Sequence, residues 1–281
     1  MQAQTLPAAA GWRWIGAGFA IFRRNPPLLS MLVVSYWLTV LVLNVLPVIG
    51  ALAASLVIPG LSVGLMQAAR DLERGQPIGL PTLFGGLKRN TRTLLALGAL
   101  YLGVTIAILG LSALVDGGEL LRFMLASKAV DREEIEGANF LLPSLFVMIL
   151  MVPVLMAYWF APVLAAWHGL GVGKSLFFSF IACWLNWRAF LAYGAAMVFV
   201  AGVIPGLVFG MLAAVFSGGD SGFVSRFIIM PFMTMIALIV FSTIYASYYV
   251  SYRDVFGIQD IDWAARPLRR QLRSGPLRPS A

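Results

Sequence analysis

The amino-acid sequence predicts an all-α fold: a polytopic membrane bundle of six transmembrane helices, built as three parallel-repeat helical hairpins that each follow an interfacial amphipathic helix. Three observations predict it. First, 60% of the 281 residues are hydrophobic and only 11% are charged, against about 25% charged in soluble domains. Second, residues 26–69 contain no Asp, Glu, Lys or Arg. Third, a short motif recurs ahead of three long apolar stretches.

Residues 26–69 must fold back on themselves. These 44 residues would form a single helix about 66 Å long, whereas the hydrocarbon core of a bilayer is about 30 Å thick. The sequence LPVIG at 46–50 is the natural hinge, because proline lacks the N–H that a helix interior needs and glycine tolerates a turn. We therefore expect the first two spans at about 28–46 and 48–69.

The recurring motif is Asn-x-Arg followed by an apolar run in two copies, and a fainter third copy near the N-terminus shares the basic residues and the asparagine. Residues 90–99 (NTRTLLALGA) overlie residues 186–195 (NWRAFLAYGA), and FRRN at 22–25 overlies LKRN at 87–90. Internal similarity of this kind indicates that one unit was used repeatedly. We expect three copies, each an interfacial helix that leads into membrane spans.

The interfacial helices are predicted from helical spacing. In residues 11–24 the apolar side chains recur on one face while three arginines lie elsewhere, and residues 82–92 and 169–188 repeat this pattern. Basic amphipathic segments of this length lie in the plane of the membrane interface.

The remaining elements follow in order. Proline at 153 and 162 predicts a kink in the fourth span, because neighbouring groups in a bundle can satisfy the carbonyls that proline leaves free. The tail has a basic, proline-rich composition that favours disorder. The elements expected are spans at about 93–115, 141–166, 189–216 and 227–250, a hydrophilic extracytoplasmic insertion at 116–139 and a disordered cytoplasmic tail at 264–281.

The positions of Lys and Arg predict the orientation. The segments assigned to one side carry 3, 5, 2 and 6 basic residues, a total of 16, against 3 and 1 on the other side. Cytoplasmic segments are enriched in Lys and Arg, so both termini are expected in the cytoplasm. Every repeat then begins on the same side of the membrane, so the repeats are expected to be parallel. No cleavable signal peptide is visible, so the first span is expected to remain as an anchor.

The sequence lacks the residue patterns of a disulfide, a metal cluster, a nucleotide-binding loop or a catalytic site. One cysteine, Cys183, and one histidine, His168, exclude an intrachain disulfide and a histidine-based metal cluster. Residues 168–175 (HGLGVGKS) resemble a phosphate loop, but histidine stands where the motif needs glycine and a membrane helix precedes it. No carboxylate lies mid-span and no catalytic constellation is present. We expect no enzyme, cofactor, metal or nucleic-acid partner.

Two groups of polar residues are candidates for binding a ligand. Tyr245, Tyr249 and Tyr252 share one face of the last span with Ser242. They form either an aromatic belt or the wall of a hydrated, cytoplasm-facing cavity. The second group would lie at the rim of that side and consists of Asn90, Arg92, Asn186 and Arg188. These four residues alternatively cap helices and attract anionic phospholipids of the cytoplasmic leaflet.

Two stripes of small residues predict close helix contacts. Gly60 and Gly64 form one, and Gly202, Gly206 and Gly210 form the other. Small residues let membrane helices approach closely. Packing within the bundle is favoured over dimerisation for both stripes.

Two motifs resemble a known family. Residues 252–256 (YRDVF), directly after a Ser/Tyr-rich final span, and residues 12–26 (WRWIGAGFAIFRRNP) resemble uncharacterised six-helix inner-membrane proteins of proteobacteria. The final span is more distantly similar to the membrane domain fused to some bacterial glycerophosphodiester phosphodiesterases. The resemblance implies a multi-pass inner-membrane location without a known activity, and the phosphodiesterase catalytic domain is absent from this chain.

Two functions are consistent with these patterns. The first is non-enzymatic binding or transport of a lipid or other amphipathic ligand between the hairpins. The alternative is a membrane scaffold or assembly factor whose tail and 116–139 insertion contact another membrane protein.

Overall fold

A computed structural model describes the chain except for residues 1–2, 47–48, 119–140, 216–224 and 258–281. The described residues form helices and contain no strand, and six helices are long and apolar enough to cross a membrane. The predicted all-α class and number of spans are therefore confirmed, while most of the 116–139 insertion and the whole 264–281 tail lie outside the described residues. The six spans are Pro26–Asn44, Ile49–Glu73, Thr91–Asp116, Leu141–His168, Trp187–Leu212 and Phe227–Val255.

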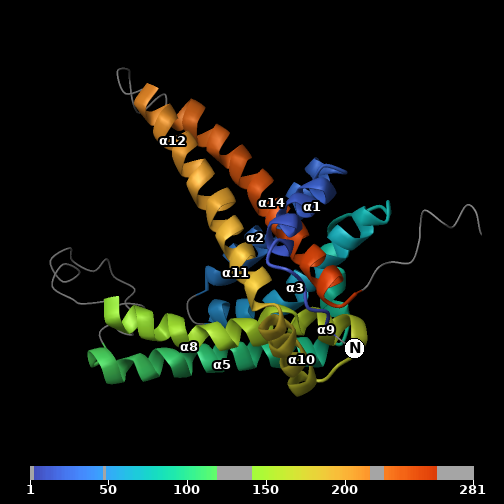
Figure 1. Cartoon of the computed structure of the whole chain (residues 1–281), viewed down its shortest axis with the longest axis vertical. Helices are drawn as coiled ribbons and strands as arrows, with labels where there is room; N and C mark the ends of the chain where they lie inside the picture. The colour runs from blue at the N-terminus through green and yellow to red at the C-terminus, as the bar shows by residue number, and fades with distance from the viewer. Residues whose placement is uncertain (1–2, 47–48, 119–140, 216–224, 258–281) are drawn as a thin grey trace, which may run out of the picture.

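The spans pair into three hairpins that share one end. Figure 1 shows the second and third hairpins diverging from this end, with the first hairpin behind them. The first hairpin consists of α2 (Pro26–Asn44) and α3 (Ile49–Glu73). The second consists of α5 (Thr91–Asp116), α8 (Leu141–Trp159) and α9 (Ala161–His168). The third consists of α11 (Trp187–Val198), η2 (Phe199–Val203), α12 (Ile204–Val215), η3 (Ser225–Ile229) and α14 (Met230–Val255).

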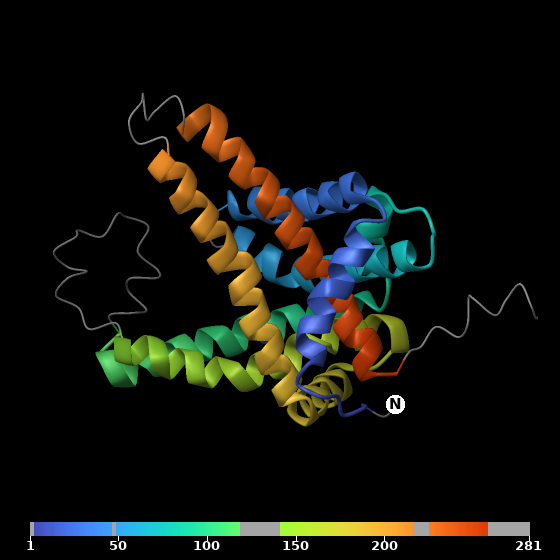
Figure 2. The same ribbon diagram turned by 45° about the horizontal axis from the view of Figure 1, so that its top comes forward.

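Four short helices connect and brace the hairpins. They are α1 (Ala10–Phe22), α4 (Leu80–Gly85) with η1 (Gly86–Lys88), and α10 (Val172–Leu185). Helix α1 packs against α14 and α11, as Figure 2 shows for α14, while α4 and η1 pack against α3 and α10 packs against α8. Each of these short helices thus packs against the second span of a hairpin: α4 and η1 against that of the first hairpin, α10 against that of the second, and α1 against that of the third. The triplication of one unit stays a prediction.

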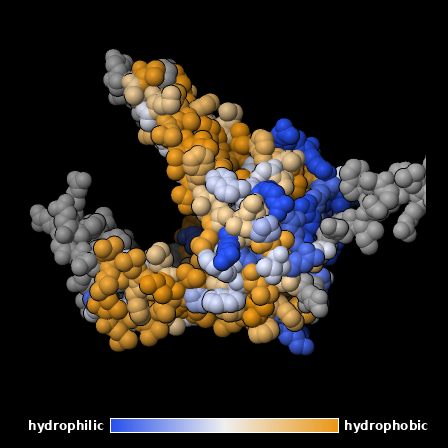
Figure 3. Space-filling model, viewed as in Figure 1, coloured by the Kyte–Doolittle hydropathy of each residue, from blue (hydrophilic) through white to orange (hydrophobic). Residues whose placement is uncertain are grey.

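We call the shared end of the hairpins the polar end. Here α3, α9 and α14 end, and α2, α5 and α11 begin. Figure 3 shows hydrophilic side chains gathered at this end and apolar side chains covering the two diverging hairpins, with a hollow between them. The exposed apolar side chains on the hairpins include Val152, Leu155, Leu191 and Leu207. Exposure of such surface is stable only in an apolar solvent, in agreement with membrane spans.

The two glycine stripes have different surroundings. A Cβ atom on Gly64 would lie 1.9 Å from the Leu83 carbonyl oxygen, and one on Gly60 would lie 2.3 Å from the Leu87 side chain. Only glycine permits this approach of η1 and α4 to α3. In contrast, a Cβ atom on Gly202, Gly206 or Gly210 would meet nothing within 4 Å. The structure therefore does not pack the second stripe within the bundle, contrary to expectation.

The fourth span is interrupted where its second proline was expected to kink it. Pro162 has no N–H for the carbonyl four residues earlier, and α8 ends at Trp159 before α9 begins at Ala161. The buried hydroxyl of Ser179, on α10, bridges the break. It accepts a hydrogen bond from the Phe160 N–H at 2.8 Å and donates one to the Met156 carbonyl at 2.9 Å. A brace helix thus satisfies the backbone that proline disrupts.

Removal of this bridge should destabilise the bundle. We expect Ser179→Ala to lower the free energy of unfolding by about 2 kcal/mol, because it leaves a buried N–H and a buried carbonyl without a partner. Equilibrium unfolding in mixed micelles measures this. Thr234→Ala is the control, because its exposed hydroxyl bonds only to a carbonyl of its own helix. Equal losses in both variants would contradict a bridging role.

Candidate ligand-binding site

The tyrosine stripe of the last span lies in the packed interior at the polar end. Tyr249 and Tyr252 are 3% and 1% exposed. The Tyr249 hydroxyl donates to Glu73 Oε2 on α3 at 2.7 Å, and the Tyr252 hydroxyl lies 2.6 Å from Nε2 of His168 on α9. These two tyrosines therefore connect α14 to the first and second hairpins, and neither presents its side chain to solvent.

Tyr245 lies deeper along the same face. Its ring packs against Tyr36 of α2, with ring centroids 5.5 Å apart, and it is half-buried. The stripe as a whole joins the hairpins by aromatic and hydrogen-bonded contacts.

An ion-pair cluster connects the two motifs that carry the family resemblance. Arg253 pairs with Glu73 and, through Nη2 at 2.9 Å, with Asp254 Oδ1. Asp254 Oδ2 accepts a hydrogen bond from Nε1 of Trp14 at 3.1 Å. Trp14, on α1, is completely buried and packs against Phe190 and Tyr193. Residues from 12–26 and from 252–256 thus meet in one structural network.

The repeated asparagines lie at the corners where each hairpin begins. Asn25 accepts from the Leu28 N–H at 3.3 Å and caps α2. Asn90, which has a positive φ of 48°, donates to the carbonyls of Ala165 and Leu170 at 3.0 and 3.3 Å. Asparagine tolerates this left-handed conformation better than most residues.

Asn186 is the most buried of the three corner residues, at 1% exposure. Its Oδ1 accepts from the Leu6 N–H at 2.8 Å, and its Nδ2 donates to the carbonyls of Gln4 and Ala182 at 2.8 and 2.9 Å. Gln4 N–H in turn bonds to the Val255 carbonyl at 2.7 Å. This corner therefore fastens the N-terminal segment to the end of the last span.

The seven residues expected to bind a ligand do not form one site. Arg92 and Arg188 are exposed, and the Arg188 guanidinium lies 5.4 Å from the ring centroid of Trp187. The two asparagines are corner residues, and the tyrosines hold the hairpins together. Arg188 lies beside a pocket, because Trp187, whose ring it contacts, lines that pocket.

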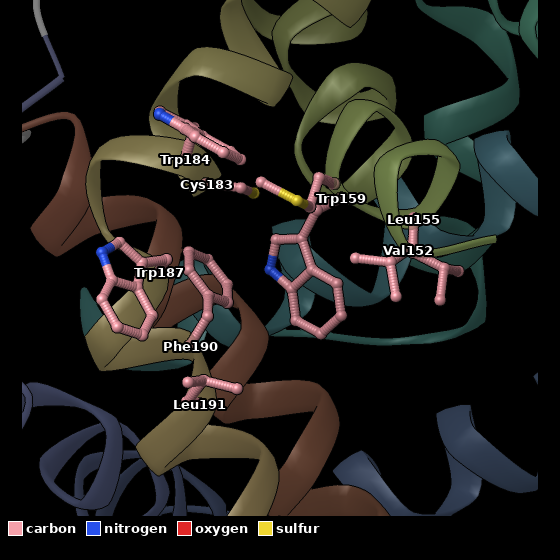
Figure 4. A pocket seen from close by; sticks show the side chains of 9 residues that line it. Val152, Leu155, Trp159, Cys183, Trp184, Trp187, Phe190 and Leu191 are labelled. Atoms are coloured by element: carbon pink, nitrogen blue, oxygen red, sulfur yellow. The ribbon is translucent and has the colours of Figure 1, made fainter. Parts of the chain in front are cut away.

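That pocket lies between α8 and the α10–α11 corner. Its volume is about 550 Å³, within the range of about 300–1,000 Å³ typical of small-molecule sites. Figure 4 shows Trp159 opposite Trp184, Trp187 and Phe190, with Cys183 between them. The lining is apolar apart from indole nitrogens and one thiol. The residues that line it are Val152, Leu155, Met156, Trp159, Cys183, Trp184, Trp187, Phe190 and Leu191.

The pocket is built by local features of the two hairpins. The break before α9 positions Trp159 at the end of α8, where its ring packs edge-on against Phe190 at 5.5 Å and Tyr248 at 5.2 Å. The α10–α11 corner at Asn186 turns Trp184 and Trp187 outward, and they are 61% and 52% exposed. The sequence had shown these tryptophans only as the apolar face of an interfacial helix, so the pocket itself was not anticipated.

Burial changes the chemistry of the single thiol. Desolvation raises the pKa of Cys183 from its ordinary 9.0 to about 12, against a smaller opposing effect of its hydrogen bond with Ser179. Only the thiolate is a good nucleophile. The thiol therefore behaves as an apolar group of the pocket wall at neutral pH.

The shifted pKa predicts slow alkylation of Cys183. At pH 8 we expect N-ethylmaleimide to react about a thousandfold more slowly than with a thiol of pKa 9.0, because the pKa is three units higher. The rate should rise tenfold per pH unit up to the shifted pKa. Gly173→Cys in a Cys183→Ser chain is the control, because this α10 position is exposed. A fast reaction of Cys183 at pH 7 would show that its thiol is solvated.

Comparison with known proteins supports membrane residence. The chain is 37% identical over 267 residues to a probable inner membrane protein of Burkholderia thailandensis, and the match covers 92% of this chain and 96% of that protein. The chain belongs to the same family as this probable inner membrane protein. It is accordingly a probable integral inner-membrane protein with multiple spans.

No family model and no solved structure matches the chain. The more distant likeness to the membrane domain of glycerophosphodiester phosphodiesterases stays a prediction. The comparison identifies no activity.

Proposed function

We propose that this protein binds a lipid or another amphipathic molecule of the inner membrane, without catalysing a reaction, in the pocket between the second and third hairpins. The apolar, tryptophan-walled pocket carries the proposal. It is lined by residues of α8 and α11, which belong to two hairpins that carry exposed apolar side chains. An acyl chain can enter such a pocket directly from the bilayer.

The surroundings of the pocket favour an amphipathic ligand over a purely apolar one. Trp184 and Trp187 are amphipathic side chains of the kind that gather at membrane interfaces. Arg188 lies over the Trp187 ring and is exposed. Its charge can attract an anionic headgroup, an effect of about 1 kcal/mol per basic residue near a membrane surface. The predicted orientation places this headgroup in the cytoplasmic leaflet.

Filling the pocket should abolish lipid retention. We expect Val152→Trp to reduce the phosphatidylglycerol bound to the purified full-length protein at least fivefold, because the larger ring occupies the space between α8 and α11. Native mass spectrometry in an uncharged detergent measures the bound lipid.

Leu100→Trp is the matched control. Leu100 is an exposed residue of α5 that does not line the pocket, so its replacement should leave the bound lipid within twofold of the wild type. Equal lipid retention by wild type and Val152→Trp would rule out this pocket as the binding site.

The alternative function is a scaffold that binds another membrane protein. The open glycine stripe on η2 and α12 favours it, since Gly202, Gly206 and Gly210 leave room for the backbone of a second helix. In that case Gly206→Leu would abolish co-purification of the partner while lipid retention remained normal. Unchanged co-purification of partner proteins by Gly206→Leu would count against the scaffold function.

A further inference from the structure

The polar end carries a large excess of positive charge among the described residues. Within the described ranges, three carboxylates lie there: Asp71, Glu73 and Asp254. Each is already engaged: Asp71 accepts a hydrogen bond from Gln67 at 2.7 Å, and the other two bind Arg253, Tyr249 or Trp14. The basic residues at this end are Arg13, Arg23, Arg24, Arg70, Arg74, Lys88, Arg89, Arg92, Lys174, Arg188 and Arg253.

Arg70 differs from the other half-buried arginine of this end. The guanidinium of Arg253 binds two carboxylates. That of Arg70 has no hydrogen-bond or ion-pair partner within the described part of the chain, although the residue is half-buried in the last turn of α3. It lies 4.9 Å from the ring centroid of Trp167, on α9. A partly desolvated guanidinium without a counter-ion is costly, and an anion would offset that cost.

Two further N–H donors belong to Trp167, whose ring lies beside this guanidinium, and to the next residue of α9. The Trp167 indole N–H is buried and has no hydrogen-bond partner among the residues that the structure describes. The adjacent His168 is exposed and uses Nε2 toward the Tyr252 hydroxyl, which leaves Nδ1 free to contact a ligand. Donors from α3 and α9 thus lie near the junction of the three hairpins, and among the described residues neither the Arg70 guanidinium nor the Trp167 N–H has an acceptor.

We infer that Arg70, together with Trp167 and His168, forms a binding site for a phosphate group at the junction of α3, α9 and α14. The guanidinium supplies a planar fork that matches two phosphate oxygens, and the two aromatic side chains supply further N–H donors. The phosphate belongs to a lipid headgroup or is free in solution. The site lies on α3 and α9, whereas the proposed lipid pocket lies between α8 and α11, so each can be present without the other.

The test measures phosphate binding to the purified full-length protein in an uncharged detergent. Isothermal titration with inorganic phosphate, at constant ionic strength with chloride as reference, is one arm. Titration with dihexanoyl phosphatidylglycerol is the other. We expect the wild type to bind at least one probe, and Arg70→Gln to weaken that binding at least about tenfold, the effect of losing one charge-assisted hydrogen bond. Binding of the lipid alone identifies a headgroup site, and binding of both probes shows that phosphate is sufficient.

Three further variants make the result specific. Arg23→Gln removes an exposed arginine that also lies over a ring of its own helix, Phe19, and should change the affinity less than twofold. His168→Gln preserves the contact of Arg70 with Trp167 and should weaken binding about threefold, which decides the question if Arg70→Gln fails to fold. Val152→Trp should leave inorganic phosphate affinity unchanged. Equal affinity of wild type and Arg70→Gln for both probes, or no affinity of the wild type for either, would overturn the inference.

Discussion

Replacement of Asn186 by leucine is expected to lower the free energy of unfolding by about 3 kcal/mol, the cost of several buried polar groups that lose their partners. The residue is almost completely buried and makes three hydrogen bonds, two of them to Gln4 and Leu6. Leucine has a similar volume, so packing changes little while the two backbone groups of the N-terminal segment become unsatisfied. Unfolding in mixed micelles, followed by circular dichroism, measures the change.

The same variant should also release the N-terminal segment. We expect limited trypsin digestion to cut at Arg13 faster in Asn186→Leu than in the wild type. Asn44→Leu is the control, because the exposed amide of Asn44 bonds only to the Val40 carbonyl of its own helix, and its loss should cost no more than about 0.5 kcal/mol. If both asparagine variants were equally stable, the corner at Asn186 would not fasten the segment.

The ion pair between Glu73 and Arg253 is expected to couple the first and third hairpins by about 1–2 kcal/mol, between the values typical of exposed and buried pairs. The side chains are 21% and 26% exposed, so solvent screens the pair only in part. A double-mutant cycle with Glu73→Gln and Arg253→Gln isolates this coupling from the other losses. The coupling should weaken at high salt.

Tyr249→Phe separates the ion pair from the hydrogen bond that an uncharged hydroxyl donates to the same carboxylate. It removes the 2.7 Å contact with Glu73 Oε2 and leaves Arg253 in place, so we expect a loss of about 1.5–2 kcal/mol that depends less on salt than the ion pair does. Strict additivity of the Glu73 and Arg253 substitutions would refute a coupling between the hairpins at this point.

The positions of the spans were largely predictable because hydropathy is a local property. The differences lie at helix ends. The first span begins at Pro26 and not at 28, because proline suits the first helical turn and Asn25 caps it. The last span continues to Val255 and not to 250, since Tyr252 and Arg253 are held by partners on α9 and α3. Tertiary contacts extended a helix that composition alone would have ended.

The candidate site was much less predictable. Spacing correctly placed Tyr245, Tyr249 and Tyr252 on one face, but the structure turns that face inward against α2, α3 and α9. The pocket joins Val152 and Trp159 to Leu191, and these residues belong to different hairpins. No periodicity within a single segment signals such a pairing.

The sequence alone determined that this protein belongs in a membrane, that it has six spans and that its positive charge collects in particular connections. Those properties depend on the transfer free energy and charge of short segments, which neighbouring segments barely alter. The tertiary structure decided which polar groups have partners. Among the described residues it gave Arg253 two carboxylates and Arg70 none, and it placed a pocket between α8 and α11. Those outcomes depend on how separate hairpins approach one another, so only the folded chain defines them.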